Sequence, residues 1–195
     1  MKLYMIRHGE SADNLAKRHS GWAQSPLTEK GEADGIRAGE LLKNVSFDKI
    51  FCSDQRRAMQ TCALALPERM DVEYTPLLRE TNVGILQGQL MADCREKYGE
   101  AYTTTRRVRN FTPFCGEDNA MHVERVRAFV ERLLAGNWNS VAAFCHGGTI
   151  DSMLEITHGK EARANATNIF NGSVTVFSYE NGQWNLEKWA STEPV

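Results

Sequence analysis

The sequence lacks the long apolar stretches that mark membrane and exported proteins. No run approaches the roughly 18 apolar residues that a membrane-spanning helix needs, and the N-terminus has no basic segment followed by an apolar stretch of signal-peptide length. The five cysteines form an odd, scattered set without a C-x-x-C pair, which is typical of free thiols in a reducing compartment. We therefore expect a cytoplasmic protein with no membrane partner.

The sequence also lacks an excess of charge of either sign. Its 23 Lys and Arg residues and 25 Asp and Glu residues give a formal net charge of −2 at pH 7. This balance does not fit the strongly basic surface of a nucleic-acid-binding protein, so no nucleic-acid partner is expected. With 42% apolar and 25% charged residues, the 195-residue chain is typical of a soluble globular domain. Its oligomeric state is left open.

Several motifs of phosphate and hydrolytic chemistry are missing as well. The chain has no G-x-x-x-x-G-K-[ST] phosphate loop and no G-x-S-x-G nucleophile motif. No cysteine is followed by an arginine six positions later, and no D-x-D pair is present. These absences exclude P-loop enzymes, cysteine-nucleophile phosphatases and the common aspartyl-phosphate and magnesium sites.

What the sequence does contain is an alternation of short apolar runs and helical patterns. The expected strands are Leu3–Ile6, Lys49–Cys52, Val72–Thr75, Val141–Cys145, Val174–Tyr179 and Gln183–Trp189. The expected helices are Glu29–Lys43 with Thr28 as N-cap, a helix capped by Ser53 that runs through Leu66, about Leu90–Tyr98, one from Asn119 onward, and Gly147–His158. The alternation predicts an α/β fold, a three-layer sandwich with a mostly parallel central sheet and helices on both faces.

The end of the chain and its middle depart from this pattern. Asn181-Gly182 lies between the last two expected strands and is a strong hairpin signal, which predicts an antiparallel edge to the sheet. Residues 85–118 contain glycines and arginines without clear periodicity. We expect a single domain over residues 1–195, with a small insertion at about 85–118 over the edge that carries the site.

Polar side chains gather where the expected strands end. Arg7 and His8 follow the first strand, Arg57 lies just beyond the second, and Glu80 and His146 follow the third and fourth. Because ligands of open α/β sheets bind beyond the carboxyl ends of the strands, we expect these side chains to converge. Arginine forks match phosphate oxygens, and nearby positive charge favours neutral, nucleophilic histidine. The same arginines would repel a divalent cation, so no metal is expected.

The residues alone leave two interpretations open. A strand-end histidine, a helix arginine and a loop carboxylate each have ordinary structural roles when taken singly. Their coincidence at predicted strand ends indicates an anion site, which is either catalytic or only a binding site.

Five segments in order along the chain resemble the motifs of the histidine phosphatase superfamily, also called the phosphoglycerate mutase-like family. They are Arg7–Asn14 (R-H-G-E-S-A-D-N), Gly21–Gly31, Ser53–Thr61, Leu78–Gly88 and His146–Gly148. The first resembles the family's R-H-G-E-[ST]-x-x-N signature. Any one motif is weak, but the ordered set is specific and extends over nearly the whole chain.

The resemblance implies a mechanism. His8 would attack phosphorus and become phosphohistidine, while Arg7, Arg57 and His146 would surround the transferred phosphoryl group. Glu80 would protonate the leaving oxygen and later accept a proton from the acceptor. No organic cofactor is implied. The further substrate-binding residues expected are Asn14, Ser20, Gly21, Arg106, Arg107 and Gly147. The histidines without a motif role are expected at the surface or at helix ends: His19, His122 and His158.

The family includes phosphatases and mutases, and the sequence carries signs of both. Arg106-Arg107 resembles the paired arginine with which mutases bind a substrate carboxylate. Against a mutase, Val83 stands where mutases carry tyrosine, Met91 where they carry lysine and Gly148 where they usually carry asparagine. We therefore expect a metal-independent phosphomonoester phosphatase that acts through phosphohistidine on a small phosphorylated metabolite. The alternatives are cofactor-dependent phosphoglycerate mutase-type phosphoryl transfer and a non-catalytic domain that binds a phosphorylated ligand.

Overall fold

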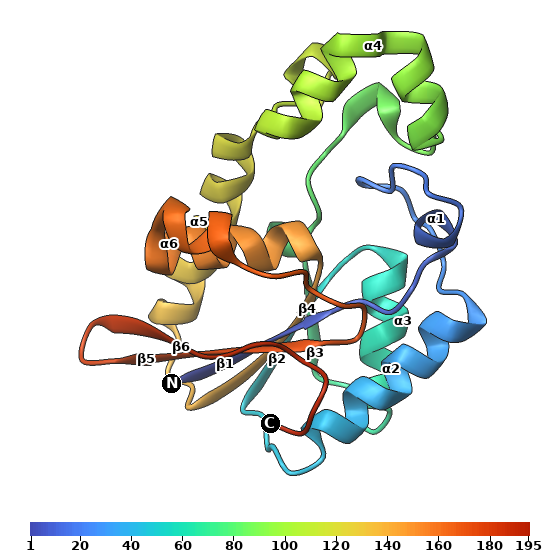
Figure 1. Ribbon diagram of the computed structural model, residues 1–195. Helices are drawn as coiled ribbons and strands as arrows, with labels where there is room; N and C mark the ends of the chain where they lie inside the picture. Colours follow the sequence, from blue (N-terminus) through green and yellow to red (C-terminus); the bar gives the residue numbers. More distant parts are fainter.

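A six-stranded sheet forms the centre of the computed structural model, which describes residues 1–195 (Figure 1). The strands lie in the order β3-β2-β4-β1-β5-β6. Their bounds are β1 Lys2–Arg7, β2 Lys49–Ser53, β3 Val72–Thr75, β4 Ser140–Cys145, β5 Val174–Glu180 and β6 Gln183–Ser191. The strands β1 to β4 run parallel, and β5 pairs antiparallel with both β1 and β6. The predicted mostly parallel sheet with an antiparallel edge is confirmed.

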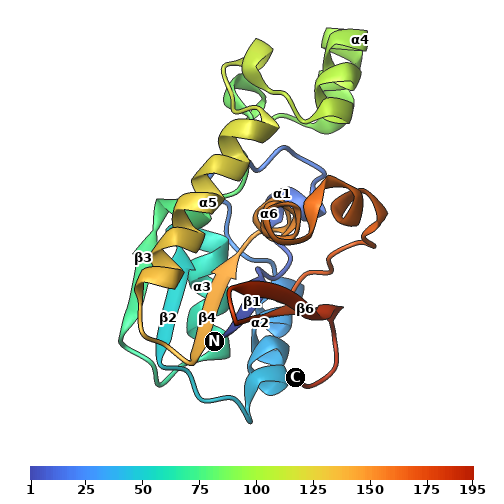
Figure 2. The same ribbon diagram turned by 90° about the vertical axis from the view of Figure 1, so that its left-hand side faces the viewer.

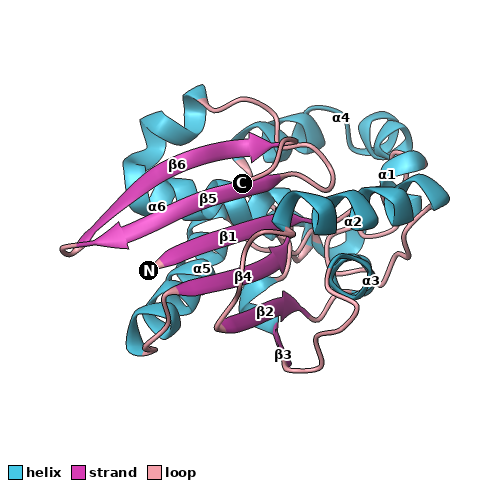
Figure 3. Ribbon diagram, turned by 90° about the horizontal axis from the view of Figure 1, so that it is seen from below, coloured by secondary structure: helices cyan, strands magenta, loops and turns pink.

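Helices cover both faces of this sheet, as Figures 2 and 3 show. On one face, α2 (Glu29–Leu42) and α3 (Arg56–Ala65) pack against side chains such as Tyr4 and Ile6. On the other, α5 (Asn119–Ala135) and α6 (Gly147–Asn165) pack against Leu3 and Met5. Successive side chains of a strand point to opposite faces, so the continuous apolar run of β1 serves both cores. The three-layer α/β sandwich is thus confirmed.

Two local predictions match the structure residue by residue. Asn181 and Gly182 have positive φ values of 52° and 81°, the conformation that a two-residue hairpin between twisted strands requires. Thr28 is the N-cap of α2, where its hydroxyl oxygen accepts the backbone N–H of Gly31 at 3.1 Å. Turns and helix caps of this kind can be predicted from the sequence because they depend on only a few neighbouring residues.

The predicted cap at Ser53 is wrong. Ser53 is the last residue of β2, and Gln55 holds the N-cap position of α3 without a side-chain capping bond. The hydroxyl of Ser53 instead pairs with the ring of His146, 93 residues away in the chain. The Ser53 hydroxyl, which the sequence assigns to capping the helix, therefore makes a hydrogen bond to a residue distant in sequence.

The helix α6 breaks at Gly159, where φ is 87°, so the helix expected to end at His158 does end there, and a second helical stretch continues to Asn165. Two further short elements complete the fold near the sheet: α1 (Ala12–Leu15), capped by Ser11, and the 3₁₀ turn Pro76–Leu78 after β3. No helix of the structure is both long and apolar enough to cross a membrane. All five cysteines are free, as expected.

The segment after β3 forms a substructure away from the sheet, visible at the top of Figures 1 and 2. Its helix α4 runs over Met91–Val108, but Gly99 (φ 53°, ψ −127°) has non-helical backbone and divides α4 into two helices at a kink, so the helix predicted to end at about Tyr98 does end there and a second helix follows. The segment has its own apolar cluster, separate from the two sheet cores. The members of that cluster are Val83, Leu86, Cys94, Tyr102, Phe111 and Phe114.

Candidate active site

The structure brings the five predicted chemical side chains together at the carboxyl edge of the parallel strands. We call this group the strand-edge cluster; it consists of Arg7, His8, Arg57, Glu80 and His146. Arg7 ends β1, Arg57 lies in the first turn of α3, and His146 joins β4 to α6. Parallel strands place their ends at one edge, so residues up to 139 positions apart in sequence become neighbours.

The His8 ring is held by both of its nitrogen atoms. Nδ1 lies 2.6 Å from the carbonyl oxygen of Gly9, and Nε2 lies 3.2 Å from Nε of Arg57. Since a carbonyl only accepts, Nδ1 carries the proton and Nε2 presents a lone pair. Burial, and next the positive charges of Arg57 and Arg7, hold the pKa of His8 well below its usual range. The ring is therefore neutral at neutral pH, the form in which imidazole is a nucleophile.

Arg57 is completely buried and is tied to the loop that crosses it. Its Nη1 donates to the carbonyl of Ala23 at 2.9 Å and its Nη2 to the carbonyl of Gly21 at 3.0 Å. Burial lowers its pKa to about 10, so the guanidinium remains charged at neutral pH. Burying a cation without a carboxylate partner costs folding free energy. Here Nε of Arg57 donates to the lone pair of His8 Nε2 instead.

His146 lies beside His8, with the two ring centroids 5.1 Å apart. Nε2 of His146 is 2.9 Å from the Ser53 hydroxyl, whereas its buried Nδ1 has no hydrogen-bond partner in the chain. When the Ser53 hydroxyl donates to Nε2, the proton of the neutral ring sits on Nδ1, which is then a free donor. Burial, then Arg57, lowers the pKa of His146 well below its usual range.

Arg7 presents a second uncommitted donor. Its Nη1 donates to the carbonyl of Ile169, but its buried Nε has no partner. Gly147 lies directly beside it: a Cβ built on this glycine would be 3.6 Å from Arg7 Nε. Gly147 is also the first residue of α6, a helix end whose free N–H groups and positive dipole favour an anion.

Glu80 is half-buried and fixed through both carboxylate oxygens. Oε1 accepts the backbone N–H of Thr81 at 2.8 Å, and Oε2 accepts that of Gly148 at 3.1 Å. Burial is the largest single influence and raises its pKa, but the charge that His122 carries once it is protonated at low pH, the two backbone donors and Arg109 together hold the pKa of Glu80 below its usual value. Its own backbone N–H donates to the side chain of Gln55 at 2.8 Å.

A cavity of about 1170 Å³ opens onto the cluster. Arg7, Glu80 and the backbone of Gly147 form part of its wall, while His8, Arg57 and His146 lie buried behind them. A second cavity of about 670 Å³ shares Arg7, Arg106 and Asn171 with the first. A ligand anion that reaches Arg7 would therefore have space for a sizeable group on its far side. No group of three or more His, Cys, Asp or Glu side chains is placed to hold a metal ion.

Comparison with known proteins agrees with this geometry. Residues 3–192 match the histidine phosphatase superfamily (branch 1). The chain belongs to this superfamily. Its members include phosphatases and mutases, and both occur among its relatives.

Two relatives and one solved structure illustrate the range. The broad-specificity phosphatase YOR283W of Saccharomyces cerevisiae is 31% identical over 189 residues, 92% of this chain and 80% of that protein. A 2,3-bisphosphoglycerate-dependent phosphoglycerate mutase of Bifidobacterium longum is 43% identical over 106 residues, but these are 51% of this chain and 43% of the mutase. The crystal structure of the alpha-ribazole phosphatase from Shigella flexneri superimposes with a TM-score of 0.91 at 26% identity, covering 100% and 98% of the two chains.

The structure distributes the other predicted substrate-binding residues unevenly within this histidine phosphatase fold. Gly147 and Arg106 line the large cavity, and Asn14 lines the second one. Gly21 acts through its carbonyl, which holds Arg57 and Gln55, and Ser20 precedes it in the same turn. Arg107, in contrast, is exposed and lines neither cavity, because adjacent helix residues point about 100° apart.

Two histidines expected at the surface are buried instead. His19 is hydrogen-bonded to the Tyr102 hydroxyl at 2.6 Å, and His122 lies 2.8 Å from the Thr81 hydroxyl. A signal for His122 was present: it is four residues before Val126, on the apolar stripe of α5. No periodicity marks His19, which lies in a loop. His158 is exposed near the break in α6, as expected.

Proposed function

We propose that the protein is a metal-independent phosphomonoester phosphatase that works through a phosphohistidine on His8. The observation that carries the proposal is the setting of the His8 ring. Its Nδ1–H is fixed on the Gly9 carbonyl, and its Nε2 lone pair lies among cationic side chains where a phosphoryl group would be held. A neutral imidazole in such a position is an activated nucleophile rather than a structural residue.

The proposed reaction has two balanced steps. In the first, the Nε2 lone pair of His8 forms an N–P bond while the ester P–O bond breaks, and Glu80, which must be protonated in the complex with the substrate, gives that proton to the leaving alcohol oxygen. In the second, Glu80 takes a proton from water, the water oxygen forms a P–O bond and the N–P bond breaks, releasing inorganic phosphate. One carboxyl thus serves as acid and then as base.

Charge on the transferred group would be stabilised by donors already in place. Arg7 Nε and His146 Nδ1 are buried and without protein partners, and the N–H of Gly147 begins α6. Buried donors rarely lack partners in folded proteins, so two such donors beside a cavity are consistent with a bound anion. Together with Arg57 they supply the preorganised positive environment that phosphoryl transfer requires.

The cavities support a substrate with an acidic group on the leaving side. Arg106 and Arg95 line the second cavity, are exposed and have no carboxylate partner in the structure. The segment around residues 85–118 would then act as an insertion over the site that supplies these cations. Small phosphorylated metabolites with a carboxylate or second phosphate fit this arrangement best.

A mutase is the second candidate, favoured by the 43% identity to the Bifidobacterium longum enzyme over about half of this chain. The structure supplies a reason against it at position 148. A Cβ on Gly148 would lie 2.1 Å from Glu80 Oε1 and 3.0 Å from Arg109, so the asparagine usual in mutases would displace the carboxyl. Val83, where mutases have tyrosine, is buried in the apolar cluster below α4.

The deciding experiment compares hydrolysis and phosphoryl transfer on the purified protein. We expect phosphate release from several carboxylated or doubly phosphorylated monoesters, without added metal and in the presence of a chelator, and no isomerisation of phosphoglycerate in a coupled assay. Isomerisation that exceeds phosphate release would replace the phosphatase by the mutase. Binding without turnover of any monoester would favour the non-catalytic alternative.

A further inference from the structure

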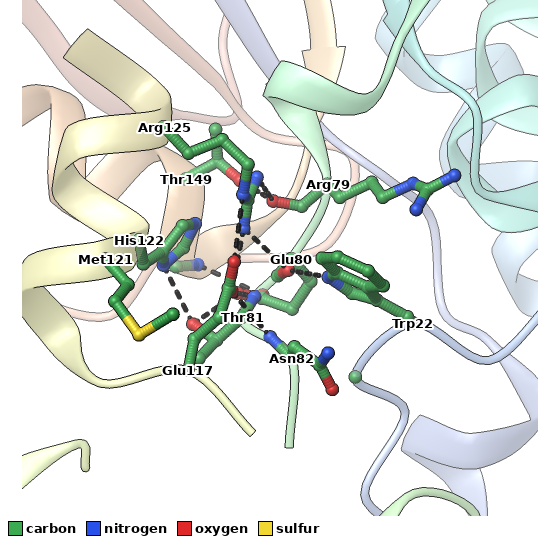
Figure 4. A network of polar contacts seen from close by, with 12 residues as sticks. Trp22, Arg79, Glu80, Thr81, Asn82, Glu117, Met121, His122, Arg125 and Thr149 are labelled. Carbon is green, nitrogen blue, oxygen red and sulfur yellow. Dashed lines mark hydrogen bonds and ion pairs between the residues drawn. The ribbon is translucent and has the colours of Figure 1, made fainter. Parts of the chain in front are cut away.

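Behind Glu80 lies a buried polar pair that the proposed reaction does not use, Thr81 and His122 (Figure 4). Nδ1 of His122 is 2.8 Å from the Thr81 hydroxyl, and that hydroxyl donates to Glu80 Oε1 at 3.4 Å. Thr81 and His122 are 6% and 1% exposed, so water does not compete for these contacts. The three side chains form a row that ends on the carboxylate.

The direction of the other hydrogen bond follows from counting protons once the Thr81 hydroxyl is assigned as the donor to Glu80. The Thr81 hydroxyl has one hydrogen, and the ionised Glu80 carboxylate can only accept. If the hydroxyl donates to Glu80, its oxygen accepts from His122, so the proton of the neutral imidazole sits on Nδ1. The other ring nitrogen, Nε2, is buried and has no partner in the chain. In this arrangement the one N–H of His122 donates to the Thr81 hydroxyl oxygen and orients that hydroxyl toward Glu80.

Counting acceptor sites shows what this does to Glu80. A carboxylate oxygen offers about two good acceptor directions. On Oε1 both are taken, by the backbone N–H and the hydroxyl of Thr81. On Oε2 only one is taken, by Gly148 N–H. The row therefore leaves Oε2 as the oxygen with room for a transferable proton.

The backbone around Glu80 is held separately, so the row has no need to anchor the loop. Arg125 Nη1 donates to the carbonyl of Arg79 at 2.7 Å, and its Nη2 donates to the carbonyl of Glu80 at 3.1 Å and to Glu117 at 3.0 Å. Glu117 in turn accepts the backbone N–H of Asn82 at 2.8 Å. Figure 4 shows this clamp on the same side of the loop as His122.

The charges around His122 keep it neutral. Burial is the main cause that lowers its pKa to about 4; Glu80 and Glu117 act in the opposite sense, and Arg125 and Arg109 add to the lowering. A neutral ring at neutral pH orients the Thr81 hydroxyl without placing a full positive charge beside the acid.

We propose that Thr81 and His122 are positioning residues for Glu80, which confine its transferable proton to Oε2 and aim it at the leaving oxygen. The inference rests on the proposed role of Glu80 as the acid. It concerns proton transfer to the leaving group, so its effect depends on how much that group needs a proton.

The test compares two substrates with the Thr81→Val variant, which keeps the β-branched shape and removes the hydroxyl. For an alkyl phosphate, whose leaving oxygen must be protonated, we expect kcat/KM to fall about tenfold, as for partial loss of a general acid. For 4-nitrophenyl phosphate, whose leaving group departs as a stable anion, we expect less than a twofold change. Thr81→Ser restores the hydroxyl and should restore the ratio between substrates.

Variants of His122 and a matched control complete the design. His122→Leu should show the same substrate-dependent loss, and His122→Asn, which keeps an N–H donor at the Nδ1 position, should retain most activity. Thr149→Val is the control: its hydroxyl bonds the carbonyls of Leu78 and Arg79 in the same loop but does not touch the carboxyl. Thr149→Val should change kcat/KM for both substrates by the same factor.

A pH profile separates orientation from loss of fold. The hydroxyl stabilises ionised Glu80, so Thr81→Val should move the basic limb of kcat/KM to higher pH. Equal losses on both substrates with an unshifted limb would overturn the positioning role. If Glu80→Gln itself fails to discriminate between the substrates, the proposed acid is wrong; if Glu80→Gln discriminates and Thr81→Val does not, only the positioning role fails.

Discussion

The strand-edge cluster and the arginines of α4 both present positive charge to one pair of cavities, yet they are built differently. Arg57 is fully buried and makes three hydrogen bonds that fix its guanidinium. Arg95 and Arg106 are exposed, and the guanidinium of Arg106 lies over the ring of Tyr102, 5.9 Å from its centroid. Hydrogen bonds within the protein thus fix the guanidinium of Arg57, whereas no ion pair fixes the side chains of Arg95 and Arg106.

Under the proposed function, this difference should separate residues that act in the reaction from residues that select the substrate. A preorganised charge stabilises a transition state without reorganisation, so changes in the cluster should lower kcat. A long exposed side chain gives up conformational entropy on binding, which limits its contribution to affinity. Changes on α4 should therefore be smaller and should appear in KM.

The largest expected effect among the arginines is at Arg57. Arg57→Lys keeps the charge but cannot bond His8, Gly21 and Ala23 together, so we expect kcat to fall by about 10²–10³, the loss typical of one preorganised transition-state donor. Steady-state kinetics on two unrelated monoesters measures it. A change in KM without a change in kcat would contradict the distinction between the two regions.

The pH dependence of stability tests the contact between the loop that holds Arg57 and helix α4. His19 connects the loop of Gly21 to Tyr102 of α4, and burial lowers its pKa to about 4 from 6.5. A folded-state pKa below the unfolded one means that the unfolded chain takes up protons first as the pH falls. Stability should therefore decrease between pH 6.5 and 4, by at most about 3 kcal/mol for this group.

Chemical denaturation of His19→Gln, which retains a hydrogen-bonding side chain but does not titrate, checks this contribution. We expect the free energy of unfolding of the variant to depend less steeply on pH over the same range. Identical slopes for variant and native protein would show that His19 does not couple the loop and α4 in the way that its contact with Tyr102 indicates.

The smallest expected effect distinguishes two neighbours on α4. Arg106 lines both cavities and Arg107 lines neither. Arg106→Ala should raise KM about fivefold to tenfold for a carboxylated monoester, as for loss of one exposed charge-assisted hydrogen bond. Arg107→Ala is the matched control and should leave KM unchanged. A neutral aryl phosphate should respond to neither, and equal effects of the two substitutions would refute the cavity assignment.

Much of the fold was predictable because its signals are local. The apolar run of β1 and the Asn181-Gly182 turn each depend on adjacent residues, and the ordered motifs identify the cluster. The predictions that were wrong or incomplete concern features that depend on residues far away in the sequence. The Ser53 hydroxyl looks like a cap until His146 is placed beside it, and the second helix of α4, beyond the kink at Gly99, has no clear apolar period in the sequence.

Arg106 and Arg107, which are adjacent in α4, show a different limit. As a pair in the sequence they are equivalent, and only the rotation of the helix against the cavities separates Arg106 from Arg107. In the same way, Thr81 and His122 are 41 residues apart, and nothing local indicates that they meet behind Glu80.

Trapping of the phosphorylated protein is the most direct test of the central claim, that His8 carries the phosphoryl group. The protein is mixed briefly with a phosphate-labelled monoester, denatured with base, digested and analysed by mass spectrometry. We predict one acid-labile phosphate on the peptide that contains His8, and none in His8→Ala, whose kcat should fall by at least about 10³. Rapid hydrolysis by His8→Ala, or label on another residue, would contradict the account.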